Sequence, residues 1–366
     1  MITVGIVGCG KIADDHVALV RAIPDCEVVG VVDREELMAM QLADRFKIGA
    51  YFTDVRSLLD QVKPQVVHVT TPPQGHFEIA RLCLQAGAHT VVEKPFTVNA
   101  REARELVDLA RRTNRKITVH HEQQFTDPAR RARKLIDEGF LGGPPIHMES
   151  YYGYELGQDA YAKSLLGDRN HWVRRLPGQL LHNVISHGIS KIAEYIPTDS
   201  PTVIAHGFAS PFVRRIGEEG IIDELRVIIS DGDHFTAYFT FSSQMRPNLH
   251  LLRVYGSKNG VEIDHDQRTL TTIKGARQKS ILEKIVSPAS YAMQHARNAR
   301  GNVGRLLRRE LHPRDGSLFL FDRFYRSVRD DAPVPVSDRE MVLTVSIMDE
   351  IFAQIGAAKP SALVQA

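Results

Sequence analysis

A glycine-rich loop near the start of the chain has the residue types and spacing of a phosphate-binding turn. Gly8, Gly10 and Ala13 follow a short apolar run and open a helical pattern. Gly8 permits a tight turn, Gly10 lets a pyrophosphate approach the backbone, and Ala13 lets the helix pack close to the strand. The first residues of that helix, Lys11 and Ile12, would face the phosphates, where the helix dipole favours negative charge. The sequence therefore predicts a dinucleotide-binding βαβ unit.

An acidic residue follows the second apolar run, about twenty residues after the glycine loop, as a dinucleotide-binding unit requires. The carboxylate of Asp33 would accept hydrogen bonds from the ribose hydroxyls and repel a 2′-phosphate, which favours NAD over NADP. Arg34 stands next to it and could turn toward a 2′-phosphate, so NADP stays open. The alternative for Arg34 is a solvated residue at the start of a helix.

Two further polar segments follow apolar runs that we expect to be strands. Thr71 and Pro72 end one run, with His76 soon after, and Glu93 and Lys94 end the next. The carboxyl ends of parallel strands meet at one edge of a sheet, and open α/β sheets bind their ligands there. We therefore predict that these residues line the cofactor site together with the glycine loop.

The elements that would position these residues change in type along the chain. The first 120 residues alternate short, β-branched strands with helices, which is typical of a parallel, doubly wound sheet. Longer alternating strands follow after about residue 121, with helices between them. We predict an α/β protein with a Rossmann dinucleotide-binding domain over 1–120. An α+β domain with a large, mostly antiparallel sheet would occupy 121–366.

Composition excludes several other classes of protein. The 366 residues are enough for two domains, and 43% hydrophobic with 25% charged residues is ordinary for a soluble enzyme. A net charge of +2 gives no general attraction to nucleic acid, and no apolar run approaches the ~20 residues of a membrane span. Three cysteines without CxxC spacing and no apparent leader sequence favour a reducing, cytoplasmic setting.

The segment 281–314 is unusual because it carries six arginines with little acid between them. Its pattern is helical, with Gly301 and Gly304 interrupting. A solvated helix face, a patch for phosphate, nucleotide-sugar or an acidic polymer, and a contact with a partner chain all remain open. The arginines are Arg297, Arg300, Arg305, Arg308, Arg309 and Arg314.

In their order and content, the motifs of the chain closely resemble the glucose–fructose oxidoreductase / inositol dehydrogenase (Gfo/Idh/MocA) family. The motifs are the glycine loop, Thr71-Pro72 with His76, Glu93-Lys94-Pro95, and a later helix that carries His187. The resemblance covers most of the chain and is weakest over 281–314. It implies an NAD(P)-dependent oxidoreductase that transfers a hydride between the nicotinamide and a ring hydroxyl of a sugar, inositol or nucleotide-sugar. It also implies a homo-oligomer, dimer or tetramer, formed through the open face of the second sheet.

The resemblance assigns roles to particular residues. Lys94 would lie beside the nicotinamide, orient the reacting hydroxyl and ease loss of its proton, and its bond to the next proline is often cis in the family. His187 matches the general base, whose unperturbed pKa lies near operating pH. Asn183, expected on the same helix face, stands where the family usually has aspartate, which puts in doubt any step that needs a carboxylate there. Gln179 replaces the family's second glycine.

Four more residues complete the predicted substrate site. Tyr152 and Trp172 offer ring faces on which a sugar stacks, although core packing explains either ring equally well. His121 and Gln124 lie at the domain junction, where a satisfied polar cluster is the alternative to substrate contact.

The sequence predicts no metal site and leaves two other functions open. His182 and His187 are five residues apart, on different faces of a helix with no acid or cysteine nearby, so no metal is expected. One alternative function oxidises a sugar only transiently, to assist elimination or glycoside cleavage, and recycles NAD. Another is a sensor or scaffold that binds NAD(H) without turnover, which the exchange of aspartate for Asn183 makes plausible.

Overall fold

The computed structural model describes residues 1–157, 162–275, 281–308, 310–311 and 314–357. These divide into two compact units. Met1–Glu122 and Ser317–Ser346 form the N-terminal unit, and Gln123–Gly316 with the chain from Ile347 onward forms the C-terminal unit. The expected division at residue 120 does not include the return of Ser317–Ser346 to the first unit.

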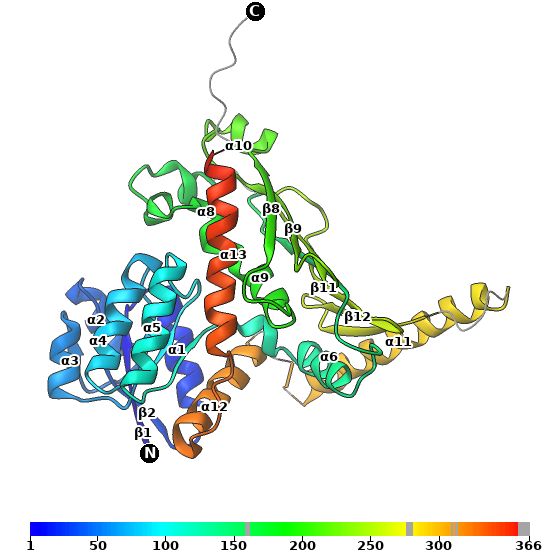
Figure 1. The fold of residues 1–366 in the computed structure, drawn as a ribbon. Coiled ribbons are helices and arrows are strands. Elements are labelled where there is room, and N and C mark those ends of the chain that lie inside the picture. The colour runs from blue at the N-terminus through cyan, green and yellow to red at the C-terminus, as the bar shows by residue number, and fades with distance from the viewer. Residues whose placement is uncertain (158–161, 276–280, 309, 312–313, 358–366) are drawn as a thin grey trace, which may run out of the picture. The chain divides into compact units, whose positions relative to one another are not determined.

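A six-stranded, all-parallel sheet forms the centre of the N-terminal unit, as predicted (Figure 1). Its strand order is β3-β2-β1-β4-β5-β6. The short strands are rich in valine and buried on both faces, because helices cover the sheet on either side. The strands are β1 (Ile2–Val7), β2 (Cys26–Val32), β3 (Tyr51–Phe52), β4 (Val66–Val69), β5 (His89–Val92) and β6 (Ile117–Val119).

Helices alternate with these strands, and a later part of the chain adds two more. Asn99 caps the helix that follows β5, as expected, because its side chain accepts the backbone N–H of Glu102 at 3.0 Å. The helices are α1 (Lys11–Arg21), α2 (Glu36–Phe46), α3 (Val55–Gln61), α4 (His76–Gln85) after the turn η1 (Pro73–Gly75), and α5 (Ala100–Arg112). The later helices are α12 (Asp315–Asp330) and α13 (Asp338–Ala357), and α13 continues into the C-terminal unit.

A seven-stranded sheet forms the C-terminal unit, in the order β13-β12-β11-β7-β10-β9-β8. Its pairs are antiparallel except for β7 with β10, which run parallel, so the prediction of a mostly antiparallel sheet is confirmed. The edge strand β13 was missed from the sequence. The strands are β7 (His147–Gly153), β8 (Thr202–Phe208), β9 (Glu224–Ser230), β10 (Thr236–Ser242), β11 (His250–Tyr255), β12 (Asn259–Asp264) and β13 (Thr269–Lys274).

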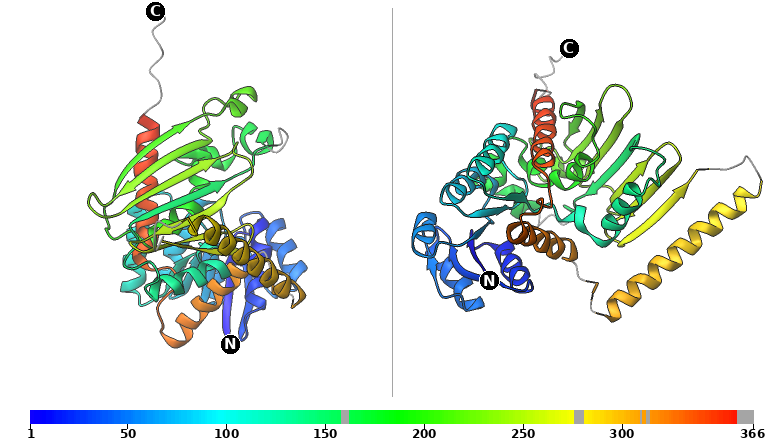
Figure 2. Two further views of the ribbon diagram at one scale, coloured as in Figure 1. Left: turned by 90° about the vertical axis from the view of Figure 1, so that its right-hand side faces the viewer. Right: turned by 60° about the horizontal axis from the view of Figure 1, so that its bottom comes forward.

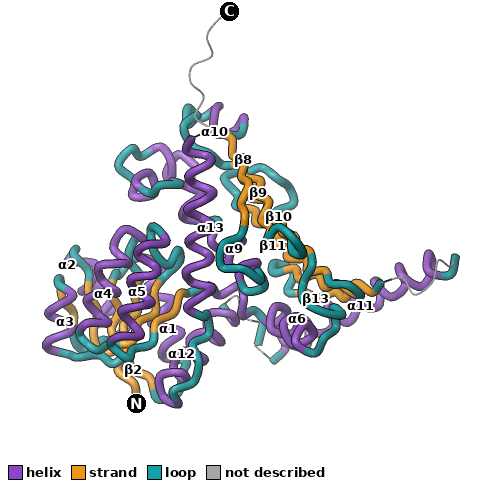
Figure 3. The backbone as a smooth tube through the Cα atoms, in the orientation of Figure 1, coloured by secondary structure: helices purple, strands orange, loops and turns teal. Residues whose placement is uncertain are grey.

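The helices of this unit alternate with loops and short helical turns (Figure 3). Gly188 lets α9 approach the sheet, because a Cβ there would lie 2.1 Å from the ring of Phe239 on β10. The helices are α6 (Asp127–Asp137), α8 (Gln179–Val184), α9 (Ser186–Ala193), α10 (Pro211–Arg215) and α11 (Glu283–Leu307). The turns are η2 (Glu122–Phe125), η3 (Lys163–Gly167) and η4 (Trp172–Arg175).

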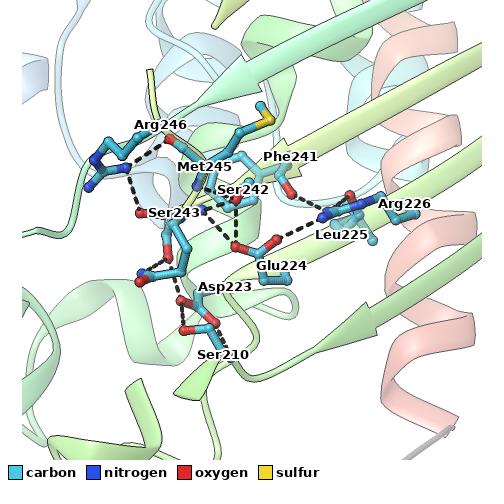
Figure 4. A network of polar contacts seen from close by, with 11 residues as sticks. Ser210, Asp223, Glu224, Leu225, Arg226, Phe241, Ser242, Ser243, Met245 and Arg246 are labelled. Carbon is cyan, nitrogen blue, oxygen red and sulfur yellow. Dashed lines mark hydrogen bonds and ion pairs between the residues drawn. The ribbon is translucent and has the colours of Figure 1, made fainter. Parts of the chain in front are cut away.

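Two buried acids tie the ends of β9 and β10 together (Figure 4). Asp223 accepts the Ser210 hydroxyl at 2.7 Å and is also bonded to the Ser243 hydroxyl. Glu224 accepts the Ser242 hydroxyl at 2.6 Å. Since these carboxylates are bonded to groups of their own unit, we attribute to them a structural role at the sheet end.

Candidate active site

The glycine loop forms a turn that only glycine fits at its first position. Gly8 has φ +99°, and a Cβ there would lie 2.8 Å from backbone atoms of Thr70 and Thr71. Around Gly10, by contrast, a Cβ would meet nothing within 4 Å. Gly10 is also the N-cap of α1 and makes no side-chain cap, so the first N–H groups of the helix are left for another acceptor. This open cradle at a helix N-terminus fits a pyrophosphate.

Alanine substitutions at Gly8 and Gly10 are expected to separate an effect on stability from an effect on cofactor binding. We expect Gly8→Ala to lower the free energy of unfolding by about 2–4 kcal/mol, through backbone strain and the clash with Thr70 and Thr71. Gly10→Ala should leave the thermal midpoint near wild type and weaken NAD binding, because its methyl group enters the open cradle. Thermal denaturation and calorimetric NAD titration measure both effects. Equal stability of the two variants, or wild-type NAD affinity in Gly10→Ala, would contradict this assignment.

Asp33 is fixed at the carboxyl end of β2. One carboxylate oxygen accepts the backbone N–H of Cys9 at 2.7 Å, and the other accepts the N–H of Glu35 at 3.0 Å. The side chain is half-buried, whereas Arg34 is exposed. The carboxylate therefore braces the glycine loop from the next strand, and its contact with a ribose stays a prediction.

His76 joins the two polar segments that follow β4 and β5. Its Nε2 lies 2.8 Å from the Thr71 carbonyl and its Nδ1 lies 2.9 Å from the Pro95 carbonyl. The ring is fully buried, which lowers its pKa, while the two carbonyls favour an N–H at each nitrogen. Pro72 is exposed and Thr71 half-buried. His76 thus links the segment after β4 to the segment after β5.

Lys94 lies at the carboxyl end of β5 with a half-buried side chain. The Lys94–Pro95 peptide bond is cis, as the resemblance implied. The backbone N–H of Lys94 donates to Oε2 of Glu93 at 3.1 Å. The Glu93 side chain itself is buried and turned into the core.

Glu93 belongs to a hydrogen-bonded chain of five buried side chains that the sequence did not reveal. The Tyr325 hydroxyl of α12 lies 2.8 Å from Nε2 of His68 on β4. Nδ1 of His68 lies 2.8 Å from Nδ1 of His16 on α1. Nε2 of His16 lies 2.8 Å from Oε1 of Glu93, and Nδ1 of His120 is bonded to the same oxygen. All five are at most 6% exposed.

All hydrogen bonds of this five-residue network can be oriented so that their donors point toward an ionised Glu93. Burial alone would raise the pKa of Glu93, but His120 and His16 hold it well below its usual range. Burial lowers the pKa of His16 and of His68, so both rings stay neutral, each donating from one nitrogen and accepting at the other. Burial also opposes charge on His120, but the Glu93 carboxylate outweighs it and raises the pKa of that ring.

His16, Glu93 and His120 are also close enough to be considered as metal ligands. The contacts fit hydrogen bonds better, because one carboxylate oxygen accepts from both imidazoles, with Nε2 of His16 at 2.8 Å. Ligands bound tetrahedrally to zinc at about 2.0–2.2 Å would stand about 3.3 Å or more apart. We therefore interpret the cluster as a hydrogen-bonded network.

The buried histidines predict loss of stability in acid. Burial lowers the pKa of His16, His68, His76 and His121, the last to about 3. As the pH falls through 6.5, these histidines bind protons in the unfolded chain but stay neutral in the folded one. The free energy of unfolding therefore falls by up to about 1.4 kcal/mol per pH unit for each ring. His120, with its raised pKa, contributes in the opposite sense: its stabilisation is full below 6.5 and is lost as the pH rises through its folded value.

The thermal midpoint, followed by circular dichroism from neutral pH to about pH 5, measures this loss. We expect a steep fall over that window. A midpoint that stays constant, or rises, as the pH falls would show that these rings accept protons in the folded state.

The helix expected over 183–195 is broken in the structure. α8 ends at Val184 and α9 begins at Ser186, with Ile185 between them. The break is local: the backbone N–H of Gly188 donates to the carbonyl of Ile185, three residues earlier, as in the tighter turn of a 3₁₀-helix. Asn183 and His187 therefore lie on two successive helices, and both side chains are half-buried.

Gln179, which replaces the family's second glycine, has φ +47°. This is the left-handed region that favours glycine, so the backbone keeps the glycine conformation although the side chain has changed. The preceding Gly178 cannot change in the same way, because a Cβ there would lie 2.1 Å from the ring of Phe352.

His187 belongs to an aromatic and cationic cluster on β7, α9 and β11. Tyr152 stacks on His187 with ring centroids 5.2 Å apart, and on His250 at 4.6 Å. Nζ of Lys191 lies 6.0 Å from the centre of the Tyr152 ring. His250 contacts Asp266 at 2.7 Å. Lys191 and His250 were missed from the sequence, although Lys191 is one helical turn after His187, because nothing local shows that a lysine is buried.

The remaining predicted substrate residues differ in their surroundings. His121 is 2% exposed, and neither ring nitrogen has a hydrogen-bond partner among the described residues. Gln124 is also buried. Trp172 is half-buried and stacks on His171 with ring centroids 5.5 Å apart. The buried, unsatisfied ring of His121 fits a polar ligand better than a completed core, so its substrate role stays a prediction.

The basic segment forms one long helix, α11, rather than an interrupted one. Gly301 and Gly304 lie inside it. Arg305 pairs with Asp127 at 2.7 Å, and Arg308 pairs with Glu310 at 2.8 Å. Arg309 lies outside the described residues. The two described pairs favour internal stabilisation over a free phosphate patch. Among the described helices none is long and apolar enough to cross a membrane.

Comparison with known proteins agrees with this architecture. The sequence model of the Gfo/Idh/MocA family, described as "Oxidoreductase family, NAD-binding Rossmann fold", matches residues 2–121. A D-glucoside 3-dehydrogenase of Escherichia coli is 31% identical over 140 residues, which cover 38% of this chain and 40% of that relative. The chain thus spans less than half the length of this curated relative.

Solved structures extend the likeness to both units. A UDP-N-acetylglucosamine 3-dehydrogenase from Acidithiobacillus ferrooxidans aligns with TM-score 0.72 and 18% identity, covering 97% of this chain and 98% of that one. The WlbA dehydrogenase from Bordetella pertussis, in complex with NADH and UDP-GlcNAcA, aligns with TM-score 0.73 and 16% identity, covering 97% of each chain. At these identities the likeness concerns the fold. Residues 2–121 thus match the Gfo/Idh/MocA oxidoreductase family, whose model describes an NAD-binding Rossmann fold.

Proposed function

We propose that the protein is an NAD-dependent dehydrogenase that oxidises a ring hydroxyl of a sugar, inositol or nucleotide-sugar. The observation that carries this proposal is the carboxyl edge of the parallel sheet, where the open cradle at Gly10 follows β1, the braced carboxylate of Asp33 follows β2 and the half-buried Lys94 follows β5. The glycine loop, Lys11, Ile12, Asp33 and the Thr71-Pro72 segment would hold the cofactor. Bound NAD would supply the hydride acceptor.

The side chains of the N-terminal unit divide into those that touch ligands and those that support them. Lys94 would orient the reacting hydroxyl and ease loss of its proton. Glu93 and His76 are buried and bonded to protein groups, so we assign them to positioning the Lys94 loop rather than to contact with the cofactor. The histidine chain would keep Glu93 ionised, and so able to hold the backbone of Lys94.

In the C-terminal unit, His187 would take the hydroxyl proton as general base. Tyr152 stacks on one face of its ring and fixes its orientation. Nζ of Lys191, one helical turn after His187, lies 6.0 Å from the centre of the same Tyr152 ring. Asn183 would bind a neighbouring hydroxyl, since an amide donates and accepts hydrogen bonds but cannot take a proton.

We further propose a homo-oligomer, dimer or tetramer, formed through the open face of the C-terminal sheet. Ile204, Ile228 and Tyr238 lie side by side on β8, β9 and β10 and are each more than 40% exposed, which is unusual for a row of apolar side chains. The three unpaired cysteines support a reducing, cytoplasmic setting.

The test is a substrate panel. Purified protein with NAD meets free sugars, inositols, glycosides and nucleotide sugars, and the near-ultraviolet absorbance of NADH is followed. Formation of NADH with one class supports the proposal and names the substrate class. Asn183, in place of a carboxylate, favours a second candidate, an NAD(H)-bound sensor, and tight NAD binding with no NADH formed across the panel would support that instead. Product without net NADH would indicate transient redox.

A further inference from the structure

The long helix α11 leaves an apolar face without a partner among the described residues. Six of its large apolar side chains are between 56% and 79% exposed, and a large exposed apolar patch commonly marks an interaction site. They are Ile285, Val286, Met293, Val303, Leu306 and Leu307. Figures 1 and 2 show α11 running along the β13 side of the sheet, with its N-terminal end standing beyond it.

Amide side chains on the opposite face of α11 fix its orientation. Gln294 accepts the backbone N–H of Thr272 on β13 at 2.7 Å. Asn298 donates to the Leu270 carbonyl at 3.0 Å, one helical turn later. These amides bond to the backbone of an edge strand, which would otherwise present unpaired polar groups. At about 100° per residue, positions nine residues from Asn298 point about 180° away from β13. Ala289 and Leu307 are such positions, so the apolar face is turned outward.

The outward face has the spacing of a helix that pairs with another helix. Its residues follow one another at alternating intervals of four and three, the pattern of a helix–helix seam. The seam is Leu282, Val286, Ala289, Met293, Ala296, Arg300, Val303 and Leu307. Leucine and valine stand at both ends, and in the middle small and large residues alternate as Ala289, Met293, Ala296 and Arg300. When two copies of this helix run antiparallel, Met293 faces Ala296 and Arg300 faces Ala289, so each large side chain of the middle meets a small one.

We propose that α11 pairs with α11 of a second copy of this chain, antiparallel and about a two-fold axis near residues 294–295. Leu282 would then meet Leu307, and Val286 would meet Val303, across the axis. The only charge in the seam is Arg300. A parallel pair would stack the two Arg300 side chains, whereas the antiparallel pair separates them and aligns the helix dipoles favourably. The proposal does not depend on the enzymatic function.

A charge placed in the seam tests the pairing. Ala296→Glu introduces a carboxylate at an exposed seam position, and Ser287→Glu introduces it at an exposed position on the other side of the helix. Neither change enters a core, so circular dichroism and the thermal midpoint should match wild type. By sedimentation velocity of the full chain, Ala296→Glu should halve the mass of the assembly, and Ser287→Glu should leave it unchanged. Equal masses for both variants and wild type would overturn the proposal.

Cross-linking tests the direction of the pair. A cysteine in place of Met293 lies near the proposed axis, so a short bis-maleimide should join the two copies. A cysteine in place of Leu307 would lie about 37 Å from its counterpart, from 25 residues at ~1.5 Å each, and should not be joined. Wild type serves as the background: Cys9 and Cys83 are buried, and any cross-link through the half-buried Cys26 appears in wild type as well. Capture of both variants would indicate a parallel pair, and capture of neither would indicate no pair; both results overturn the proposal.

Discussion

Replacement of Lys94 by alanine is expected to lower kcat by about 10²–10⁴-fold while the Kd for NAD stays close to wild type. The reason is that Lys94 would act on the reacting hydroxyl, whereas the phosphates and ribose would be held by the glycine loop and Asp33. Steady-state kinetics with the responding substrate, and calorimetric NAD titration, separate the two effects.

The control for Lys94→Ala is Lys134→Ala. The side chain of Lys134 is 75% exposed, on a helix of the other unit, and among the described residues its one ion pair is a long contact of 3.8 Å with Glu138. Its removal should change neither turnover nor stability. Near-normal turnover in Lys94→Ala would remove the residue from the reaction, and an equal loss in Lys134→Ala would show that the effect is not local.

Replacement of His187 by alanine is expected to reduce kcat to a similar extent, by about 10²–10⁴-fold. The missing ring leaves a space against Tyr152, where it stacks in the wild type, and added imidazole should enter that space and restore part of the activity. Rescue that grows with pH as imidazole loses its proton would identify the lost group as a base. The measurement is kcat against imidazole concentration at several pH values.

His234→Ala is the matched control for His187→Ala. His234 is exposed, at the turn between β9 and β10, and that turn is held by its backbone N–H to Asp231 rather than by its ring. This variant should keep full activity and show no response to imidazole. If His187→Ala stays active, or if imidazole never restores turnover, another group must take the proton.

The N-terminal sheet was predictable because its information is local. The signals for its elements lie within a few residues of one another: short valine-rich runs for strands, glycine for turns, and Asn99 for a helix cap. The structure contains the strands and helices that these signals predict. The edge strand β13 was missed because its residues alternate weakly, and its place depends on pairing with β12 and on amides from α11.

The support beneath the site could not be predicted in the same way. His16 comes from α1, His68 from β4 and His120 from the position just after β6. Tyr325 comes from α12, some 257 residues after His68. Nothing in the neighbouring sequence of each residue shows that they meet, because the contact is made only when α12 returns to the N-terminal unit. Sequence therefore predicted Glu93 in a cofactor-binding role, whereas its carboxylate is turned toward His16 and His120.

The break in the helix before His187 could not be predicted from the sequence either. The spacing of Asn183 and His187 predicts that they share one helix face, and it does not indicate that the helix is interrupted at Ile185. At Gln179 the side chain differs from the family's glycine, but the backbone keeps a positive φ of +47°. The structural difference from the family pattern is therefore smaller than the missing glycine suggests.

The most direct test of the account follows the hydride itself. Substrates of the class that responds in the panel, carrying deuterium on the carbon that bears the reacting hydroxyl, are incubated with the enzyme and NAD, and the nicotinamide product is examined by mass spectrometry. Net hydride transfer from a ring hydroxyl carbon would give singly deuterated NADH in an amount equal to the oxidised product. Unlabelled cofactor, with deuterium retained in the product or no reaction with any carbohydrate tested, would contradict net hydride transfer from a ring hydroxyl.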